Sequence, residues 1–129
     1  MDNHQAILDV VKHYQDAIHT QNREDFIKLW SHKVQGQLIS ITHLFQGAEN
    51  IADDFLCDRI HTAYSKIDLI ADHIEINQVS EDLAIVVFSY HTDCIKRDTN
   101  EPYGFPGLET QVLIKEEGLW KLVHVHYSK

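Results

Sequence analysis

Apolar side chains recur every three or four positions over residues 4–20, which puts them on one face of a helix. Asn3 precedes this stretch and is a residue type that caps helices. The polar run Thr-Gln-Asn-Arg-Glu-Asp from residue 20 interrupts the pattern. The predicted apolar stripe consists of Ile7, Leu8, Val11, Tyr14, Ala17 and Ile18.

Two further helices are predicted before the middle of the chain. A short one begins at Asn22 or Asp25 and runs through Trp30. Residues 34–46 are richer in alternating and β-branched residues and favour two short strands or a bent hairpin. A third helix is expected over about 48–64. Its apolar face comprises Ile51, Phe55, Leu56, Ile60 and Ala63.

From residue 67 the apolar period changes to two, which is typical of strands. Strands are predicted over about 67–79, 82–97, 108–117 and 119–127. A ten-residue loop holding both prolines, Pro102 and Pro106, connects the second and third of these. The run LAIVVF at 83–88 is apolar on both faces, so we expect the helices to cover one face and a partner subunit the other.

This order of elements predicts an α+β fold, with three N-terminal helices packed on a curved antiparallel sheet. Such a cone of sheet and helices encloses a pocket. The length of 129 residues corresponds to a single domain, residues 1–129.

The chain is acidic, with 20 Asp and Glu against 11 Lys and Arg and a formal charge of −9. This charge argues against nucleic-acid and membrane partners. The start of the chain shows no leader pattern, no apolar run is long enough to span a membrane, and Cys57 and Cys94 fit no metal or redox spacing. We therefore expect a cytoplasmic protein with reduced thiols and no cofactor.

The second half of the chain carries a resemblance to a known family. The Glu81-Asp82 turn, Glu109-Thr110, the Gly118-x-Trp120 turn and the ending Val-His-Val-His-Tyr-Ser at 123–128 match a SnoaL-like domain of the nuclear transport factor 2-like superfamily. More specifically, they are similar to the association (hub) domain of calcium/calmodulin-dependent kinase II. The resemblance spans about residues 4–128. It implies a cystatin-like cone that self-associates as a homodimer or a higher oligomer.

The hub domain uses pocket arginines for small carboxylates, and by position these fall on Tyr90, Gln111 and Tyr127. Strand parity places all three on one face. Without guanidinium groups the pocket is expected to be neutral and aromatic and to take a small neutral ligand. The predicted pocket residues are Tyr14, Trp30, His43, Tyr90, Glu109, Gln111 and Tyr127.

The alternative hypothesis is a small cone-fold enzyme, of isomerase, dehydratase or cyclase type, acting by general acid/base chemistry on a neutral apolar substrate. The resemblance to ketosteroid isomerase places its first-helix tyrosine on Tyr14, but its base falls near Leu38, where no carboxylate occurs. The replacement bases considered are His43, Asp72, His73 and Glu75. A buried pocket carboxylate or histidine with a shifted pKa would favour this alternative.

Histidine is unusually frequent, with ten residues. His124 and His126 share one face of the last strand, but His91 is expected about two strand spacings away, too far for a common ion. We therefore expect no metal site. The subunit interface is predicted to include His91, Trp120, His124 and His126.

Overall fold

The computed structural model describes residues 3–128, and its first two helices follow the predicted boundaries closely. Helix α1 (Asn3–Thr20) buries the predicted stripe, including Ile7, Val11 and Ile18. Helix α2 (Arg23–Lys28) begins after Asn22, whose side-chain oxygen accepts a hydrogen bond of 3.1 Å from the Asp25 amide. This is the orphan amide that an N-cap residue satisfies.

The third helix is present but is wound more loosely than an α-helix. It starts as α3 (Ala48–Asn50) and continues as the π-helix η1 (Ile51–His61). The wider turn still buries the predicted residues Ile51, Phe55, Leu56 and Ile60. Ala63, predicted on the same face, follows the end of η1 and is exposed.

The strands form one sheet in the order β2-β1-β7-β6-β4-β3. Along the chain they are β1 (Gln37–Ser40), β2 (His43–Gln46), β3 (Tyr64–Ser80), β4 (Leu83–Lys96), β5 (Pro102–Tyr103), β6 (Pro106–Glu116) and β7 (Leu119–Ser128). Among these strands, β1 runs parallel to β7 and the other pairs are antiparallel. The connection predicted as a plain loop contains β5, which pairs with the end of β4.

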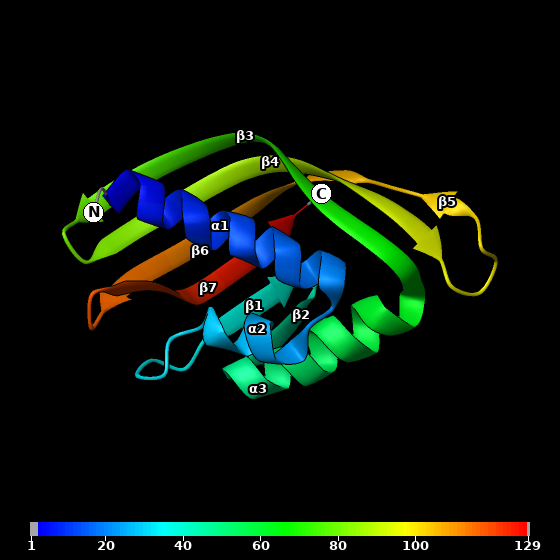
Figure 1. Cartoon of the computed structure of the whole chain (residues 1–129), viewed down its shortest axis with the longest axis horizontal. Coiled ribbons are helices and arrows are strands. Elements are labelled where there is room, and N and C mark those ends of the chain that lie inside the picture. Colours follow the sequence, from blue (N-terminus) through cyan, green and yellow to red (C-terminus); the bar gives the residue numbers. More distant parts are fainter. Residues whose placement is uncertain (1–2, 129) are drawn as a thin grey trace.

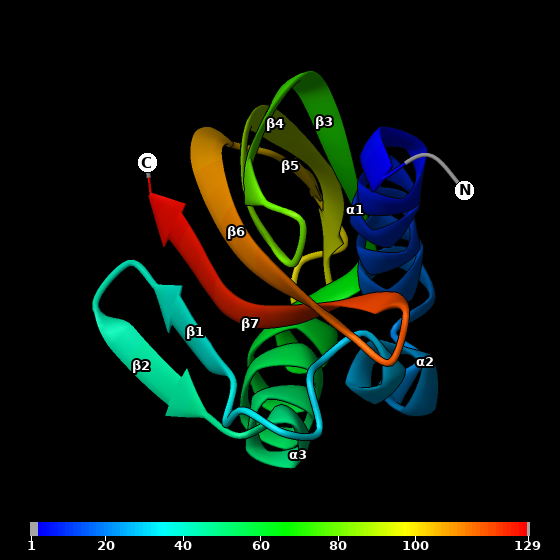
Figure 2. The ribbon, with the colours of Figure 1, turned by 90° about the vertical axis from the view of Figure 1, so that its left-hand side faces the viewer.

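The sheet is strongly curled, and the helices lie against its concave side (Figures 1 and 2). Helix α1 lies along β3, where the Gln15 side chain donates a 2.9 Å hydrogen bond to the Leu69 carbonyl. The hairpin of β1 and β2 lies beside η1 at the other side of the concave face (Figure 2). The predicted α+β cone is therefore confirmed. No helix among residues 3–128 is long and apolar enough to cross a membrane.

One part of the predicted strand parity is wrong. The register of β6 against β7 shifts between Val112 and Leu113, so the alternation of faces in β7 changes near Val123. Trp120 and Leu122 consequently face the core, although they were predicted at the outer interface face, and Trp120 is 5% exposed. His124 and His126, beyond the shift, lie on the convex face with their rings 6.5 Å apart. An extra residue in one strand has this effect because side chains alternate with a period of two.

Trp30 lies in the part of the hydrophobic core between α2 and the sheet. Its fully buried ring contacts Phe26, with ring centroids 6.1 Å apart, and a bridge pairs its backbone with Leu122 of β7. Gly36 passes directly over the indole, so that a Cβ atom added there would lie 2.5 Å from Trp30 Cε3. The glycine at this position is therefore required by packing.

We expect Gly36→Ala to lower the free energy of unfolding by about 1–3 kcal/mol, because the added methyl group must displace a fully packed ring. Chemical denaturation followed by tryptophan fluorescence measures the effect. Val34→Ala, in the same loop at a half-exposed side chain, is the control and should change stability by less than about 0.5 kcal/mol. Equal stability of Gly36→Ala and the wild type would show that the indole can move aside.

Candidate functional site

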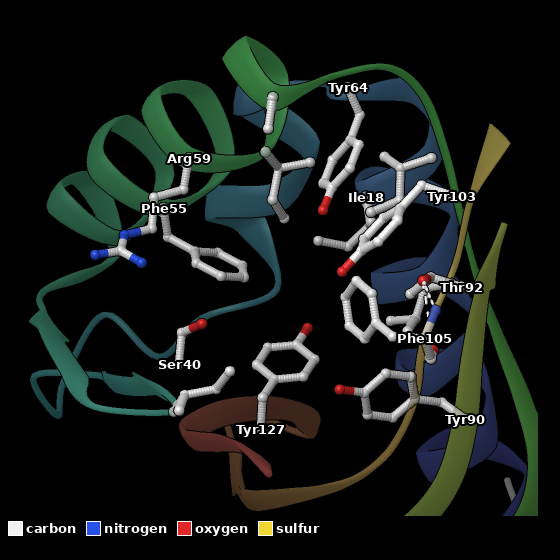
Figure 3. Close-up of a pocket in the computed structure, with 15 residues that line it drawn as sticks. Ile18, Ser40, Phe55, Arg59, Tyr64, Tyr90, Thr92, Tyr103, Phe105 and Tyr127 are labelled. Atoms are coloured by element: carbon white, nitrogen blue, oxygen red, sulfur yellow. Dashed lines mark hydrogen bonds between the residues drawn. The ribbon is translucent and has the colours of Figure 1, made fainter. Parts of the chain in front are cut away.

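A cavity of about 240 Å³ opens at one end of the cone. It lies between η1, the C-terminal end of β4, the β5–β6 connection and the last residues of β7 (Figure 3). Its wall is mostly aromatic and aliphatic, which is typical of a site for an organic ligand. The aromatic members of the lining are Phe55, Tyr64, Tyr90, Tyr103, Phe105 and Tyr127.

The hydroxyl groups of four tyrosines point into this cavity, namely those of Tyr64, Tyr90, Tyr103 and Tyr127 (Figure 3). Within residues 3–128, the hydroxyls of the first three make no hydrogen bond with another side chain or backbone group. A hydroxyl group in a largely apolar site usually finds a partner. The cavity therefore presents three hydrogen-bonding groups to whatever occupies it.

Beneath the cavity wall lies a buried polar cluster. The Tyr127 hydroxyl forms a 2.5 Å hydrogen bond with that of Tyr14 on α1. On β6, directly opposite Tyr127, the fully buried Glu109 accepts a 2.6 Å hydrogen bond at Oε2 from Gln111 Nε2. The other oxygen of each side chain, Glu109 Oε1 and Gln111 Oε1, has no hydrogen-bond partner in the described part of the chain.

Burial controls the ionisation of this cluster. It raises the pKa of Glu109 to about 8, although contacts from Gln111 and Tyr127 act in the opposite direction. Burial, with a smaller contribution from Glu109, also raises the pKa of Tyr90 to about 12. Burial likewise holds the pKa values of Tyr14 and Tyr127 well above the usual range. At neutral pH the cluster is therefore largely uncharged, with Glu109 in its acid form.

Five of the predicted pocket residues come together here. Tyr90 and Tyr127 line the cavity, and Tyr14, Glu109 and Gln111 support Tyr127 from behind. The three positions matched to hub arginines thus share the concave face, as strand parity predicted.

Two predicted pocket residues lie elsewhere. Trp30 belongs to the part of the hydrophobic core between α2 and the sheet, and its indole nitrogen has no hydrogen-bond partner among residues 3–128. His43 begins β2 and is exposed, stacking on Phe45 with ring centroids 6.1 Å apart. For His43 the prediction was wrong because the alternation of faces along such a short strand does not show which way the side chain at its end points.

The remaining candidate bases also lie outside the cavity. Asp72 pairs with His91 on the convex side, with 2.9 Å between Asp72 Oδ2 and His91 Nδ1. His73 and Glu75 contact each other at 2.6 Å, and both are largely exposed. The register of β3 shifts between Ala71 and His73, which redirects the side chains that a regular strand would have turned inward.

Some cavity residues were missed by sequence reasoning. Tyr103 and Phe105 lie in the Pro- and Gly-rich connection, where Tyr103 stacks on Tyr64 with ring centroids 6.2 Å apart. Two aromatic residues inside a polar connection were the available signal. Arg59 of η1 stands at the cavity edge with its guanidinium over the Phe45 ring, 5.5 Å from the ring centroid (Figure 3). Its position depends on the π-helical turn, which the α-helical spacing did not predict.

Metal-binding side chains do not gather at this site. Within the described range 3–128, no three His, Cys, Asp or Glu side chains are arranged to hold an ion. Cys94 is fully buried and Cys57 is partly buried, and both are free thiols. The chemistry of the cavity therefore depends on hydroxyl groups and aromatic rings.

We expect the free energy of unfolding of Glu109→Gln, relative to that of the wild type, to rise with pH. In the wild type the pKa of this carboxyl is raised on folding from about 4.5 to about 8, so its contribution is fully present below pH 4.5 and is lost as the pH rises through 8. Glutamine cannot ionise and has no such loss. Thermal unfolding at pH 5.5 and pH 9 measures the effect.

Glu81→Gln is the control for the change in net charge, because Glu81 lies in an exposed turn. Parallel pH profiles for Glu109→Gln and the wild type would show that Glu109 ionises as readily in the folded protein as in the unfolded chain.

Solved structures with the same architecture come from several bacterial proteins. A nuclear transport factor 2-like superfamily protein from Salmonella enterica serovar Typhimurium superposes with a TM-score of 0.90 at 26% identity, covering 96% of this chain and 88% of that one. A candidate calcium/calmodulin-dependent protein kinase II association domain from Xanthomonas campestris has a TM-score of 0.83 at 15% identity, covering 99% and 88% of the two chains. The hexachlorocyclohexane dehydrochlorinase LinA-type3 from Novosphingobium barchaimii has a TM-score of 0.83 at 14% identity, covering 97% and 84%.

The two structures below 25% identity show a common fold, and one of them is named as an enzyme while the other is named as an association domain. Among curated proteins, none matches the sequence. The family model of the SnoaL-like domain matches residues 7–129, nearly the whole chain. The protein therefore belongs to the SnoaL-like domain family and has the nuclear transport factor 2-like fold that the sequence resemblance predicted.

Proposed function

We propose that the protein is a self-associating domain that binds a small, neutral, largely apolar molecule in its aromatic cavity. The observation that carries this proposal is a set of three tyrosine hydroxyls, of Tyr64, Tyr90 and Tyr103, that have no hydrogen-bond partner among residues 3–128 and point into one largely apolar cavity (Figure 3). Packing alone would be served equally well by phenylalanine at these positions. A tyrosine hydroxyl left unpaired at an apolar surface is explained by a ligand that pairs with it.

The size and charge of the cavity define the ligand. An apolar cavity of 150 Å³ holds benzene, so about 240 Å³ accommodates one ring with a short substituent. Among the described residues that line the cavity, Arg59 carries the one permanent charge, and it lies at the edge in contact with Phe45. A carboxylate inside would meet uncharged walls and lose its hydration. The cavity therefore favours a neutral ligand.

Benzyl alcohol and benzoate are matched probes because they differ mainly in charge. We expect benzyl alcohol to bind at least about tenfold more tightly, since burying an unpaired carboxylate costs more than 1.4 kcal/mol. Ligand-observed NMR titration at pH 7 gives both dissociation constants. Arg59→Gln tests whether the exposed guanidinium contributes to residual benzoate binding. Tighter binding of benzoate to the wild type would overturn the neutral-ligand proposal.

The enzyme alternative is favoured by one observation, the buried Glu109 with its raised pKa. Shifted carboxyl groups of this kind are common at active sites. Glu109 is fully buried, however, and it does not line the cavity, whereas its cross-strand neighbour Tyr127 does. The described lining contains neither a carboxylate nor an imidazole that could take a proton from carbon. A general-acid role through Tyr127 is the form of catalysis that this arrangement supports.

Self-association is supported by the convex face of the sheet. Cross-strand pairing places Ile85 beside Val112, and Val87 beside Thr110, on the side away from the helices. Leu108, on the same face, is 53% exposed. The next strand extends this surface with His124 and His126. An apolar surface without Asp, Glu, Lys or Arg at its centre suits a second copy of the same sheet.

We expect Leu108→Lys to convert the dimer into a monomer, because two lysines would face each other across a symmetric interface. Light scattering measures the mass, and circular dichroism controls for folding. Glu101→Lys, in the exposed β4–β5 connection away from this face, is the matched change and should leave the dimer intact. A wild-type protein with the mass of one chain would contradict the proposal.

A further inference from the structure

The hydrogen bond between the buried hydroxyls of Tyr14 and Tyr127 has a definite donor and a definite acceptor. The Tyr14 hydroxyl is fully enclosed, and among residues 3–128 its hydrogen-bond partner is Tyr127 alone. A buried O–H group without an acceptor costs about 1–3 kcal/mol, whereas an oxygen readily leaves one lone pair unused. Tyr14 therefore donates and Tyr127 accepts. The proton of Tyr127 is then left for another acceptor.

Glu109 is a weak competitor for that proton at neutral pH. Its Oε2 already accepts a hydrogen bond from Gln111. Its other oxygen, Oε1, has no hydrogen-bond partner in the described part of the chain. In this geometry, among residues 3–128, neither oxygen of Glu109 accepts the Tyr127 proton. The remaining open direction is the cavity that Tyr127 lines.

Tyr90 supplies a second donor on the same wall. Its ring meets that of Tyr127 edge to face, with centroids 5.8 Å apart, and both hydroxyls point into the cavity (Figure 3). Gly107 on the neighbouring strand makes this position available, because a Cβ atom there would lie 2.5 Å from the Tyr90 hydroxyl oxygen. Two hydroxyl donors therefore face the cavity from β4 and β7, the strands on either side of β6.

We propose that this pair of hydroxyls is a binding site for a carbonyl oxygen, with Tyr127 as the principal donor and Tyr90 as the second. The ligand class is then a small ketone, aldehyde or ester whose apolar body fills the aromatic cavity. A carbonyl oxygen has two lone pairs and no proton, which matches two hydroxyl donors that face the same cavity. This inference rests on the proposed binding function and adds the chemical group that is recognised.

The ionisation of Glu109 should make carbonyl binding at this site depend on pH. The titratable and charged groups around the Tyr127 hydroxyl are Tyr14 on α1, Arg59 on η1, Tyr90 on β4 and Glu109 on β6, with Tyr64 and Tyr103 across the cavity. Glu109 has the pKa nearest neutrality among those with a resolved shift, at about 8. Its carboxylate would accept the Tyr127 proton and withdraw it from the ligand. Carbonyl binding should therefore weaken above pH 8, and Glu109→Gln should remove this dependence.

Acetophenone and ethylbenzene are the decisive probes, because they share a shape and differ in the carbonyl oxygen. We expect the wild type to bind acetophenone about five- to tenfold more tightly at pH 6.5, the effect of one or two net hydrogen bonds. Infrared spectroscopy of the bound ketone should show its C=O stretch at lower wavenumber than in an apolar solvent. Tyr127→Phe should abolish both the preference and most of the shift. Thr20→Val, which removes an exposed hydroxyl at the end of α1 and outside the cavity lining, is the control and should keep both.

The outcomes separate the two proposals. If neither probe binds, the binding function itself is wrong. If both bind equally and the C=O stretch is unshifted, the cavity binds apolar molecules without recognising a carbonyl, and only the present inference is overturned. Ethylbenzene binding by Tyr127→Phe confirms that the variant is folded. A preference that persists in Tyr127→Phe but disappears in Tyr90→Phe would overturn the assignment of Tyr127 as principal donor.

Discussion

The hydrogen bond between Tyr14 and Tyr127 joins the first helix to the last strand, across 113 positions of the chain. It lies in the fully packed centre of the cone, where neither hydroxyl could be left unpaired without cost. Because one of its partners also lines the cavity, the same bond that closes the core orients the cavity wall. The remainder of the site is arranged around it, with Glu109 opposite Tyr127 on the neighbouring strand.

The buried carboxyl shows why this centre can be polar without being charged. A fully enclosed carboxylate would carry a large desolvation penalty, and no Lys or Arg side chain contacts Glu109 in residues 3–128 to offset it. The acid form avoids the penalty and makes Glu109 resemble Gln111, its neighbour two positions along β6. The pair therefore acts as a neutral hydrogen-bonding platform beneath the aromatic wall. An uncharged platform is consistent with a ligand that is polar at one atom and apolar elsewhere.

Positional matching to the hub domain selected Tyr90, Gln111 and Tyr127, and the alternation of the strands predicted that they share a face. Tyr90, Gln111 and Tyr127 were expected on one face because each lies at the right parity in a long strand, and they do share it. The same rule failed where a strand contains an extra residue, so that Trp120 faces inward and His73 outward. Such register shifts depend on how two strands pair, and a single strand's composition carries no trace of them. Arg59 was missed for the equivalent reason in a helix, because its direction follows from a π-helical turn.

The histidines and the net charge of −9, which stand out in the composition, lie away from this chemistry. His124 and His126 lie on the convex face, while Glu109, one of the 20 acidic residues, is neutral inside the concave face. Each strand of the sheet thus supplies two different surfaces from alternate residues, as β6 does with Leu108 outside and Glu109 inside. A substitution on one face can for this reason be tested without altering the other. One sheet separates the proposed association surface from the proposed ligand cavity, so that substitutions could change the two properties independently.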